Sequence, residues 1–109
     1  MEKLIKGDIV VIPFPFSDLS DSKRRPAFVL ADLQGDDVIL CQITSQNVKD
    51  AYAISLNEID FVKGSLNQQS NIRPNRLFTA SKIIIVKKIG SVSNTLSNKV
   101  IDKLFEILK

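Results

Sequence analysis

The 109-residue chain carries 15 Lys and Arg against 12 Asp and Glu, a net charge of +3, and its mean hydropathy is near zero. These values predict one soluble globular domain, residues 1–109, and permit a polyanion as partner. The chain has no histidine, which excludes a His-based nuclease, a protease triad and a His-ligated zinc site. A single cysteine, Cys41, and the lack of long apolar runs predict a cytoplasmic protein without a membrane span.

The N-terminal part of the chain predicts one buried strand and then a polar loop. Residues 9–12, Ile-Val-Val-Ile, begin the strand after a turn at residues 7–8. Prolines within residues 13–16 lack the N–H that a strand ladder needs, so this segment should leave the sheet in an extended conformation. Residues 17–24 are polar and predict an exposed loop.

The middle of the chain predicts a β-hairpin and a fourth strand. Residues 27–33 and 38–44 are apolar runs, and residues 34–37, Gln-Gly-Asp-Asp, have the composition of a tight turn. Residues 52–56 alternate well enough to form a further strand. The following stretch, residues 57–71, is rich in Asn, Gln and Ser and predicts a loop anchored to the core by Phe61 and Val62.

The C-terminal part predicts two more strands and one helix. Residues 72–79 are extended, and Pro74 places them at a sheet edge or a bulge. Residues 83–92 form another strand. From Leu96 onward apolar residues recur at helical spacing, and Ser93 is the expected N-cap. Short strands, tight turns and one amphipathic helix predict a mainly β fold, a small β-barrel capped by a helix.

Arg25 and Thr44 are the residues that best fit a chemical role. Pro26 pushes Arg25 into an extended conformation, so its guanidinium is aimed from a strand entrance. Because Arg25 and Thr44 lie about ten residues either side of the turn at Gly35, antiparallel pairing should bring them together. Arginine stabilises charge on phosphoryl oxygens, and a hydroxyl can donate to the same centre. RNA supplies its own nucleophile, the 2′-OH, so the pair suits transesterification of RNA.

Each candidate also has a purely structural interpretation. Lys23 and Arg24 fit solvated loop charges, and Thr44 fits a β-branched strand residue. Arg73 and Arg76 fit charges that protect an edge strand as well as they fit RNA binding. The Asp residues are scattered through predicted loops, and no pair has the spacing of a divalent-ion nuclease, so neither a metal site nor a cofactor is predicted.

Motifs along nearly the whole chain resemble those of the PemK/MazF family of toxins from bacterial toxin–antitoxin modules. They are Gly-Asp-Ile-Val at 7–10, Phe-Pro-Phe at 14–16, Lys-Arg-Arg-Pro-Ala-Phe-Val-Leu at 23–30, Ile-Thr-Ser-Gln at 43–46 and Ile-Arg-Pro-Asn-Arg-Leu-Phe-Thr at 72–79. The resemblance implies an SH3-like barrel of about six to seven short antiparallel strands with a C-terminal α-helix.

The resemblance also implies an activity and partners. It implies a homodimeric, metal-independent endoribonuclease that cleaves single-stranded mRNA and leaves 2′,3′-cyclic phosphate and 5′-hydroxyl ends. The family's catalytic residues map onto Arg25 and Thr44. A cognate antitoxin with a disordered acidic segment is the expected partner, and DNA binding is expected only through the antitoxin complex. We expect the RNA to contact Lys23, Arg24, Ser45, Gln46, Arg73 and Arg76.

Two other functions fit the same barrel. It also hosts gyrase poisons that do not cleave RNA, and non-catalytic SH3-like binding modules. Neither alternative needs the Arg25–Thr44 pair, so that pair favours the endoribonuclease.

Overall fold

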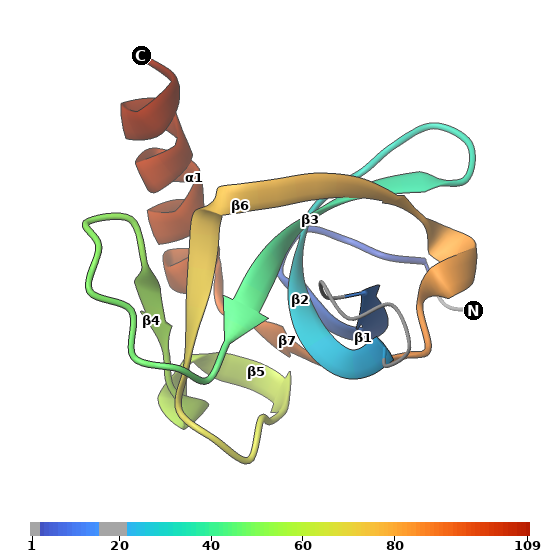
Figure 1. The fold of residues 1–109 in the computed structure, drawn as a ribbon, viewed down its shortest axis with the longest axis horizontal. Coiled ribbons are helices and arrows are strands. Elements are labelled where there is room, and N and C mark those ends of the chain that lie inside the picture. Colours follow the sequence, from blue (N-terminus) through green and yellow to red (C-terminus); the bar gives the residue numbers. More distant parts are fainter. Residues whose placement is uncertain (1–2, 16–21) are drawn as a thin grey trace.

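The computed structural model describes residues 3–15 and 22–109, and of residues 14, 15, 22 and 23 it describes the backbone only. Within these residues, seven strands form one antiparallel sheet in the order β4-β6-β3-β2-β1-β7-β5, which curls into a half-barrel with one helix beside it (Figure 1). This arrangement confirms the predicted mainly β fold with a C-terminal helix. The strands are β1 (Asp8–Pro15), β2 (Ser22–Asp32), β3 (Asp37–Thr44), β4 (Ile54–Leu56), β5 (Phe61–Gly64), β6 (Ser70–Ser81) and β7 (Lys87–Val92), and the helix is α1 (Asn94–Leu108).

The hairpin of β2 and β3 forms where the sequence predicts it. Ala27 lies opposite Gln42, and Asp32 lies opposite Val38. In the turn, Gly35 has a φ of +78°, a conformation that residues with a Cβ rarely adopt. The hairpin therefore determines which residues of the two strands are neighbours.

β2 begins earlier than the sequence predicts. Residues 22–24 belong to this strand, so their prediction as an exposed loop is wrong, whereas residues 17–21 of that loop lie outside the described residues. Pairing explains the difference, because β1 offers a ladder and Arg24 lies opposite Pro13. A neighbouring strand of this kind outweighs the weak strand preference of polar residues.

β1 also extends further than predicted. Residues 13–15, expected to leave the sheet, stay paired with β2. β7 pairs with β1 only at residues 8–11, so the missing N–H groups of Pro13 and Pro15 interrupt no ladder with β7.

Two predictions in the middle of the chain need correction. Only Ile54–Leu56 of the strand predicted at 52–56 forms, because Asp50 Oδ1 accepts hydrogen bonds from the backbone N–H groups of Tyr52 (2.9 Å) and Ala53 (3.0 Å) and turns the chain. The loop predicted at 57–71 contains a 3₁₀ turn, η1 (Glu58–Asp60), and strand β5, which pairs with the distant β7.

Of the two predicted anchors in this segment, one is right. Phe61 packs against the core, but Val62 is 67% exposed, so its predicted packing is wrong. Successive side chains of a strand point to opposite faces, so Val62 points away from the core that Phe61 packs against.

The strand predicted at 83–92 forms only from Lys87 onward. Before it lies a second 3₁₀ turn, η2 (Lys82–Ile84). The Lys82 N–H donates to the Asp36 carbonyl (2.7 Å), and Ser81 Oγ accepts from the Ile83 N–H (3.3 Å). These bonds hold a turn where the apolar run alone predicts a strand.

β6 bends at residues 74–76, which include the proline for which an edge or a bulge is predicted. Cys41 of β3 pairs with Leu77 of β6, but the next residue, Gln42, pairs with Arg73. The pairing therefore skips residues 74–76 of β6, which form a bulge. Figure 1 shows β6 turning a corner there. The bulge prediction is therefore confirmed.

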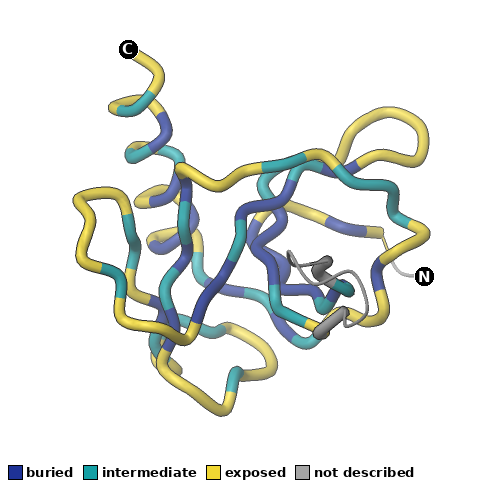
Figure 2. The backbone as a smooth tube through the Cα atoms, in the orientation of Figure 1, coloured by how far each residue is buried: buried dark blue, intermediate teal, exposed yellow. Residues whose placement is uncertain are grey.

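The sheet packs a core on each face, since members of the two cores alternate along its strands. Core cluster 1 lies under α1, where Ser93 Oγ accepts from the Leu96 N–H (3.2 Å) and confirms the predicted N-cap. Figure 2 shows that α1 is buried along one side only. Within the described residues, no helix is long and apolar enough to cross a membrane. Core cluster 1 comprises Ile9, Phe28, Cys41, Ile43, Leu56, Ile72, Val92, Leu96, Val100 and Leu104, and core cluster 2 comprises Leu4, Val10, Ile12, Ala27, Val29, Val38, Leu40 and Ile85.

Candidate nucleic-acid interface

Polar side chains from three strands continue the face of core cluster 2. Opposite residues of an antiparallel pair point to the same face of the sheet. Ile12 and Ala27 belong to core cluster 2. Arg25 lies opposite Ile12, and Gln42 lies opposite Ala27. Arg73 of β6 in turn lies opposite Gln42, so all three polar residues share this face.

Thr44 joins the same face at the end of β3. The β2–β3 register, continued two residues past the pair Ala27–Gln42, places Arg25 opposite Thr44. On its other side Thr44 lies opposite Asn71 of β6. Thr44 is only 6% exposed, so its hydroxyl has a defined environment. The observed β2–β3 pairs end at Ala27–Gln42, so the proximity of Arg25 and Thr44 stays a prediction that the continued register supports.

The Thr44 hydroxyl is oriented by the backbone that follows it. Its Oγ1 accepts a hydrogen bond from the Gln46 N–H at 3.1 Å. An oxygen that accepts here keeps its own proton to donate elsewhere. The Gln46 carbonyl accepts from Asn71 Nδ2 at 3.2 Å, which ties the chain after β3 back to β6.

Arg73 is held by an ion pair at the rim of this face. Its Nη2 lies 3.2 Å from Asp50 Oδ2, and the two side chains are 19% and 28% exposed. The pKa of Asp50 is lowered, and the largest cause is the hydrogen bond from the Tyr52 N–H. Desolvation opposes this effect, and the hydrogen bonds from Ala53 and Arg73 and the charge of Arg73 lower the pKa further. The carboxylate therefore stays charged at neutral pH.

A cavity of about 310 Å³ lies beside the open end of β2 and β3. Arg24, Arg25 and Ser45 line it, together with Gln68 and Asn67 from the segment before β6. Alternation along β2 places Arg24 on the face opposite to that of Arg25. Although they point to opposite faces, both arginines line this cavity, which lies at the start of β2.

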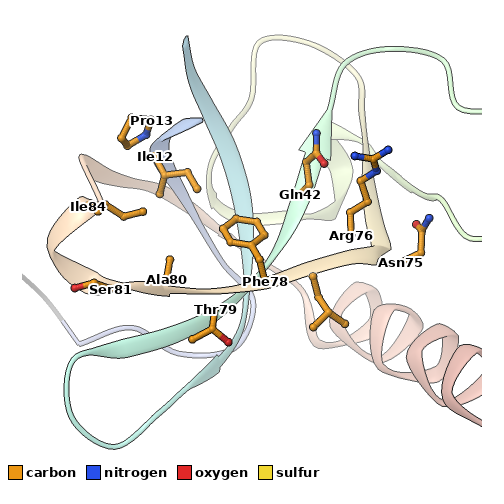
Figure 3. Close-up of a pocket in the computed structure, with 11 residues that line it drawn as sticks. Ile12, Pro13, Gln42, Asn75, Arg76, Phe78, Thr79, Ala80, Ser81 and Ile84 are labelled. Carbon is orange, nitrogen blue, oxygen red and sulfur yellow. The ribbon is translucent and has the colours of Figure 1, made fainter. Parts of the chain in front are cut away.

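A larger cavity, of about 730 Å³, lies along β6 and β1. Figure 3 shows Gln42 and Arg76 at one end of it and Ile12 at the other, with the Phe78 ring between them. Its remaining lining is mostly apolar, so Arg76 supplies the cationic group of this second cavity.

The predicted site residues therefore divide into groups. Arg25 and Thr44 share a face. Arg25 also lines the smaller cavity, together with Arg24 and Ser45, and Arg76 lines the larger. These two cavities share no lining residue, and Arg73 lines neither of them. The backbone of Lys23 lies in β2, and its side chain is outside the described part of the chain.

Sequence reasoning missed three residues of this region. Gln42 interrupts the apolar run of β3, which is a signal that could have been used. Asn71 and Asp50 gave no local signal, because their partners are 25 and 23 residues away. No group of three or more Cys, Asp or Glu residues in the described ranges is arranged to hold a metal ion. Burial raises the pKa of the Cys41 thiol to about 12, so Cys41 is an inert core residue.

Comparisons with solved structures show a shared fold at low sequence identity. An endoribonuclease in complex with its cognate antitoxin, from a mycobacterial species, has a TM-score of 0.78 and 13% identity over 97% of this chain and 95% of that one. The complex of MazE and MazF from Deinococcus radiodurans has a TM-score of 0.74 and 17% identity over 94% of each chain. The Mycobacterium tuberculosis toxin MazF-mt6 has a TM-score of 0.71 and 15% identity over 93% of this chain and 95% of that one.

The sequence comparisons identify the family. A search of curated proteins finds no match for this sequence. Residues 5–108 match the family profile of the PemK-like, MazF-like toxins of type II toxin–antitoxin systems. Since that match covers nearly the whole chain, the chain belongs to the PemK-like, MazF-like family of type II toxins.

Proposed function

We propose that this toxin is a metal-independent endoribonuclease that cleaves single-stranded mRNA, with Arg25 and Thr44 as its catalytic residues. The β2–β3 register carries the proposal, because it brings a guanidinium and an oriented hydroxyl to one face at the open end of the hairpin. Family membership and the similar structures described as endoribonucleases support it.

The proposed chemistry needs no protein nucleophile. The 2′-oxygen of the RNA bonds to the adjacent phosphorus while the bond from phosphorus to the 5′-oxygen breaks. The 2′-hydroxyl loses one proton and the 5′-oxygen gains one, so no water is consumed, and the products are a 2′,3′-cyclic phosphate and a 5′-hydroxyl. Arg25 stabilises the charge that builds on the phosphoryl oxygens, and Thr44 donates its hydroxyl proton as a hydrogen bond to one of them.

The other predicted site residues bind RNA in this proposal. Arg24 and Ser45 contact RNA from the smaller cavity, and Arg76 contacts it from the larger one. Gln46 is exposed beside Thr44, and Arg73 shares the face of Arg25. We expect Lys23 to contribute a further phosphate contact.

The proposal includes partners and a location. The substrate is mRNA, which places the toxin in the cytoplasm. A cognate antitoxin would cover the RNA-binding surface with an acidic segment that folds on contact. Phe105 and Leu108 of α1 are 62% and 74% exposed, and we expect a second copy of the chain to be the toxin's partner in a homodimer. Light scattering at micromolar concentration tests this, and a monomeric mass would contradict it.

Cleavage of a long RNA in EDTA tests the activity. The purified toxin should cleave at the same rate with and without EDTA, and end-group analysis should find cyclic phosphate and 5′-hydroxyl ends. The Arg25→Ala protein, prepared in the same way, controls for contaminating nucleases. Activity that is lost in EDTA and returns with a divalent ion would overturn the mechanism.

A further inference from the structure

Arg73 has an unusual environment for a cation at the rim of a sheet. Its side chain is only 19% exposed. One nitrogen, Nη2, is engaged by Asp50. Another, Nε, is buried and has no hydrogen-bond partner within the described residues. A buried donor without an acceptor is costly, and the charge of an anion bound at the exposed part of the side chain would offset part of that cost.

Hydrogen bonds to both carboxylate oxygens hold the Asp50 side chain in one conformation. Its Oδ1 accepts from two successive turn N–H groups, those of Tyr52 and Ala53, and its Oδ2 faces Arg73. Both carboxylate oxygens are therefore used, and the rotamer is fixed from two directions. The same segment after β3 is tied to β6 a second time, by the bond from Asn71 Nδ2 to the Gln46 carbonyl.

The location of the pair connects it with the proposed chemistry. Arg73 lies opposite Gln42 and shares the face of Arg25 and Thr44. An anion at this face can therefore meet Arg73 as well as the catalytic pair. Asp50, from the segment between β3 and β4, binds the guanidinium at Nη2, and Nε has no acceptor among the residues that the structure describes.

We propose that Asp50 is a positioning residue that holds Arg73 so that the exposed part of its side chain receives an RNA phosphate beside the Arg25–Thr44 pair. The inference rests on the proposed endoribonuclease function. Asp50 does not touch RNA itself, and it acts only through the orientation of Arg73. An acidic residue thereby strengthens the binding of a polyanion.

The direction in which Asp50→Asn changes the KM for RNA distinguishes a positioning role of Asp50 from a general effect of its charge. Asp50→Asn keeps an oxygen for the two turn N–H groups but removes the negative charge that pairs with Arg73. If Asp50 acted only as a charge near RNA, its neutralisation would tighten binding. Positioning requires the reverse, a KM for a long RNA that rises about threefold while kcat changes less than twofold. Asp32→Asn, which removes a carboxylate from the ion pair with Lys82, makes the same change in net charge and should not raise KM.

The double variant tests whether Asp50 acts through Arg73. In the Arg73→Ala background, Asp50→Asn should cause no further rise in KM, because the group that it positions is gone. A fall in KM for Asp50→Asn alone would overturn the inference, as would a rise that persists in the Arg73→Ala background. Asp50→Glu, which keeps the negative charge, should raise KM less than Asp50→Asn does.

An NMR titration with inorganic phosphate separates this inference from the proposed function. The Nε–Hε signal of Arg73, assigned by its loss in Arg73→Lys, should shift with phosphate in the parent protein and shift less in Asp50→Asn. A signal that does not respond to phosphate in the parent protein would overturn the inference. If the parent protein fails to cleave RNA but its Arg73 signal responds as expected, the endoribonuclease proposal fails while Asp50 is supported as the residue that positions Arg73 for an anion.

Discussion

The two ends of the β2–β3 hairpin use one face of the sheet in opposite ways. Near the turn the face carries Val29, Val38 and Leu40, which are fully buried in core cluster 2. At the open end the same face carries Arg25 and Thr44. The strands are continuous, so the apolar end makes the polar end rigid. A charged group on such a strand is preorganised, which is what the stabilisation of a developing charge requires.

The largest effect on rate should come from the polar end. Arg25→Ala should lower kcat by about 10²–10³-fold, because one preorganised charge-stabilising group is lost, and leave the free energy of unfolding nearly unchanged. Arg25→Lys should also be poor, since a point charge cannot replace the guanidinium fork. The matched control is Arg24→Ala, on the neighbouring residue, which should alter KM more than kcat. Equal loss of kcat in both alanine variants would erase the distinction between the two faces.

The largest effect on stability should come from the apolar end. Leu40→Ala removes a fully buried side chain and should lower the free energy of unfolding by about 2–5 kcal/mol. Denaturant unfolding measures this, and kcat per folded molecule should stay at the parent value. Val62→Ala, at a position 67% exposed, should change stability by less than about 0.5 kcal/mol. A Leu40→Ala protein with parent stability would contradict the assignment of this end to the core.

A smaller effect should appear in the salt dependence of RNA binding. Arg76 lines the larger cavity and is exposed, so it should contact phosphate without a catalytic role. Arg76→Ala should reduce the slope of log affinity against log salt by about 0.7, the value for one phosphate contact on a single strand. An unchanged slope would place Arg76 outside the RNA-binding surface.

The smallest effect concerns acid. The pKa of Asp50 is lowered in the folded protein from its ordinary value of 3.8, so its contribution to stability is present above that value and is lost as the pH falls through the lower folded pKa. Asp50→Asn should therefore differ from the parent in unfolding free energy at pH 6, and the difference should shrink below pH 3.8. A difference that grows as the pH falls would mean that the pKa of Asp50 is raised rather than lowered.

The sequence predicted those features that depend on local patterns. The turn at Gly35 and the two apolar runs around it defined the hairpin, and simple counting then placed Arg25 and Thr44 at the same end. Ser93 was readable as an N-cap because capping depends on residues within one turn.

Features that depend on contacts between residues far apart in the chain could not be predicted from the sequence. The ion pair of Asp50 with Arg73 joins residues 23 positions apart, and Asp50 lies in an irregular segment. No periodicity or motif in the sequence therefore predicts this pair. β5 forms because β7 lies beside it, and its polar surroundings in sequence predicted a loop. The position of Ile83 in a 3₁₀ turn depends on the bond from Lys82 to Asp36 of the hairpin turn. Strand preference is weak wherever such tertiary partners decide the outcome.

A double-mutant cycle on kcat/KM for RNA cleavage tests the central claim most directly, that Arg25 and Thr44 act as a unit on one phosphodiester. The four proteins are the parent, Arg25→Ala, Thr44→Val and the double variant. Thr44→Val removes the hydroxyl and keeps the β-branched shape, so the fold should persist in all four. If the residues act together, the double variant should cleave about as slowly as the worse single variant, as in other catalytic units whose members depend on one another. Losses that multiply in full would show that the two residues act independently and would contradict the claim.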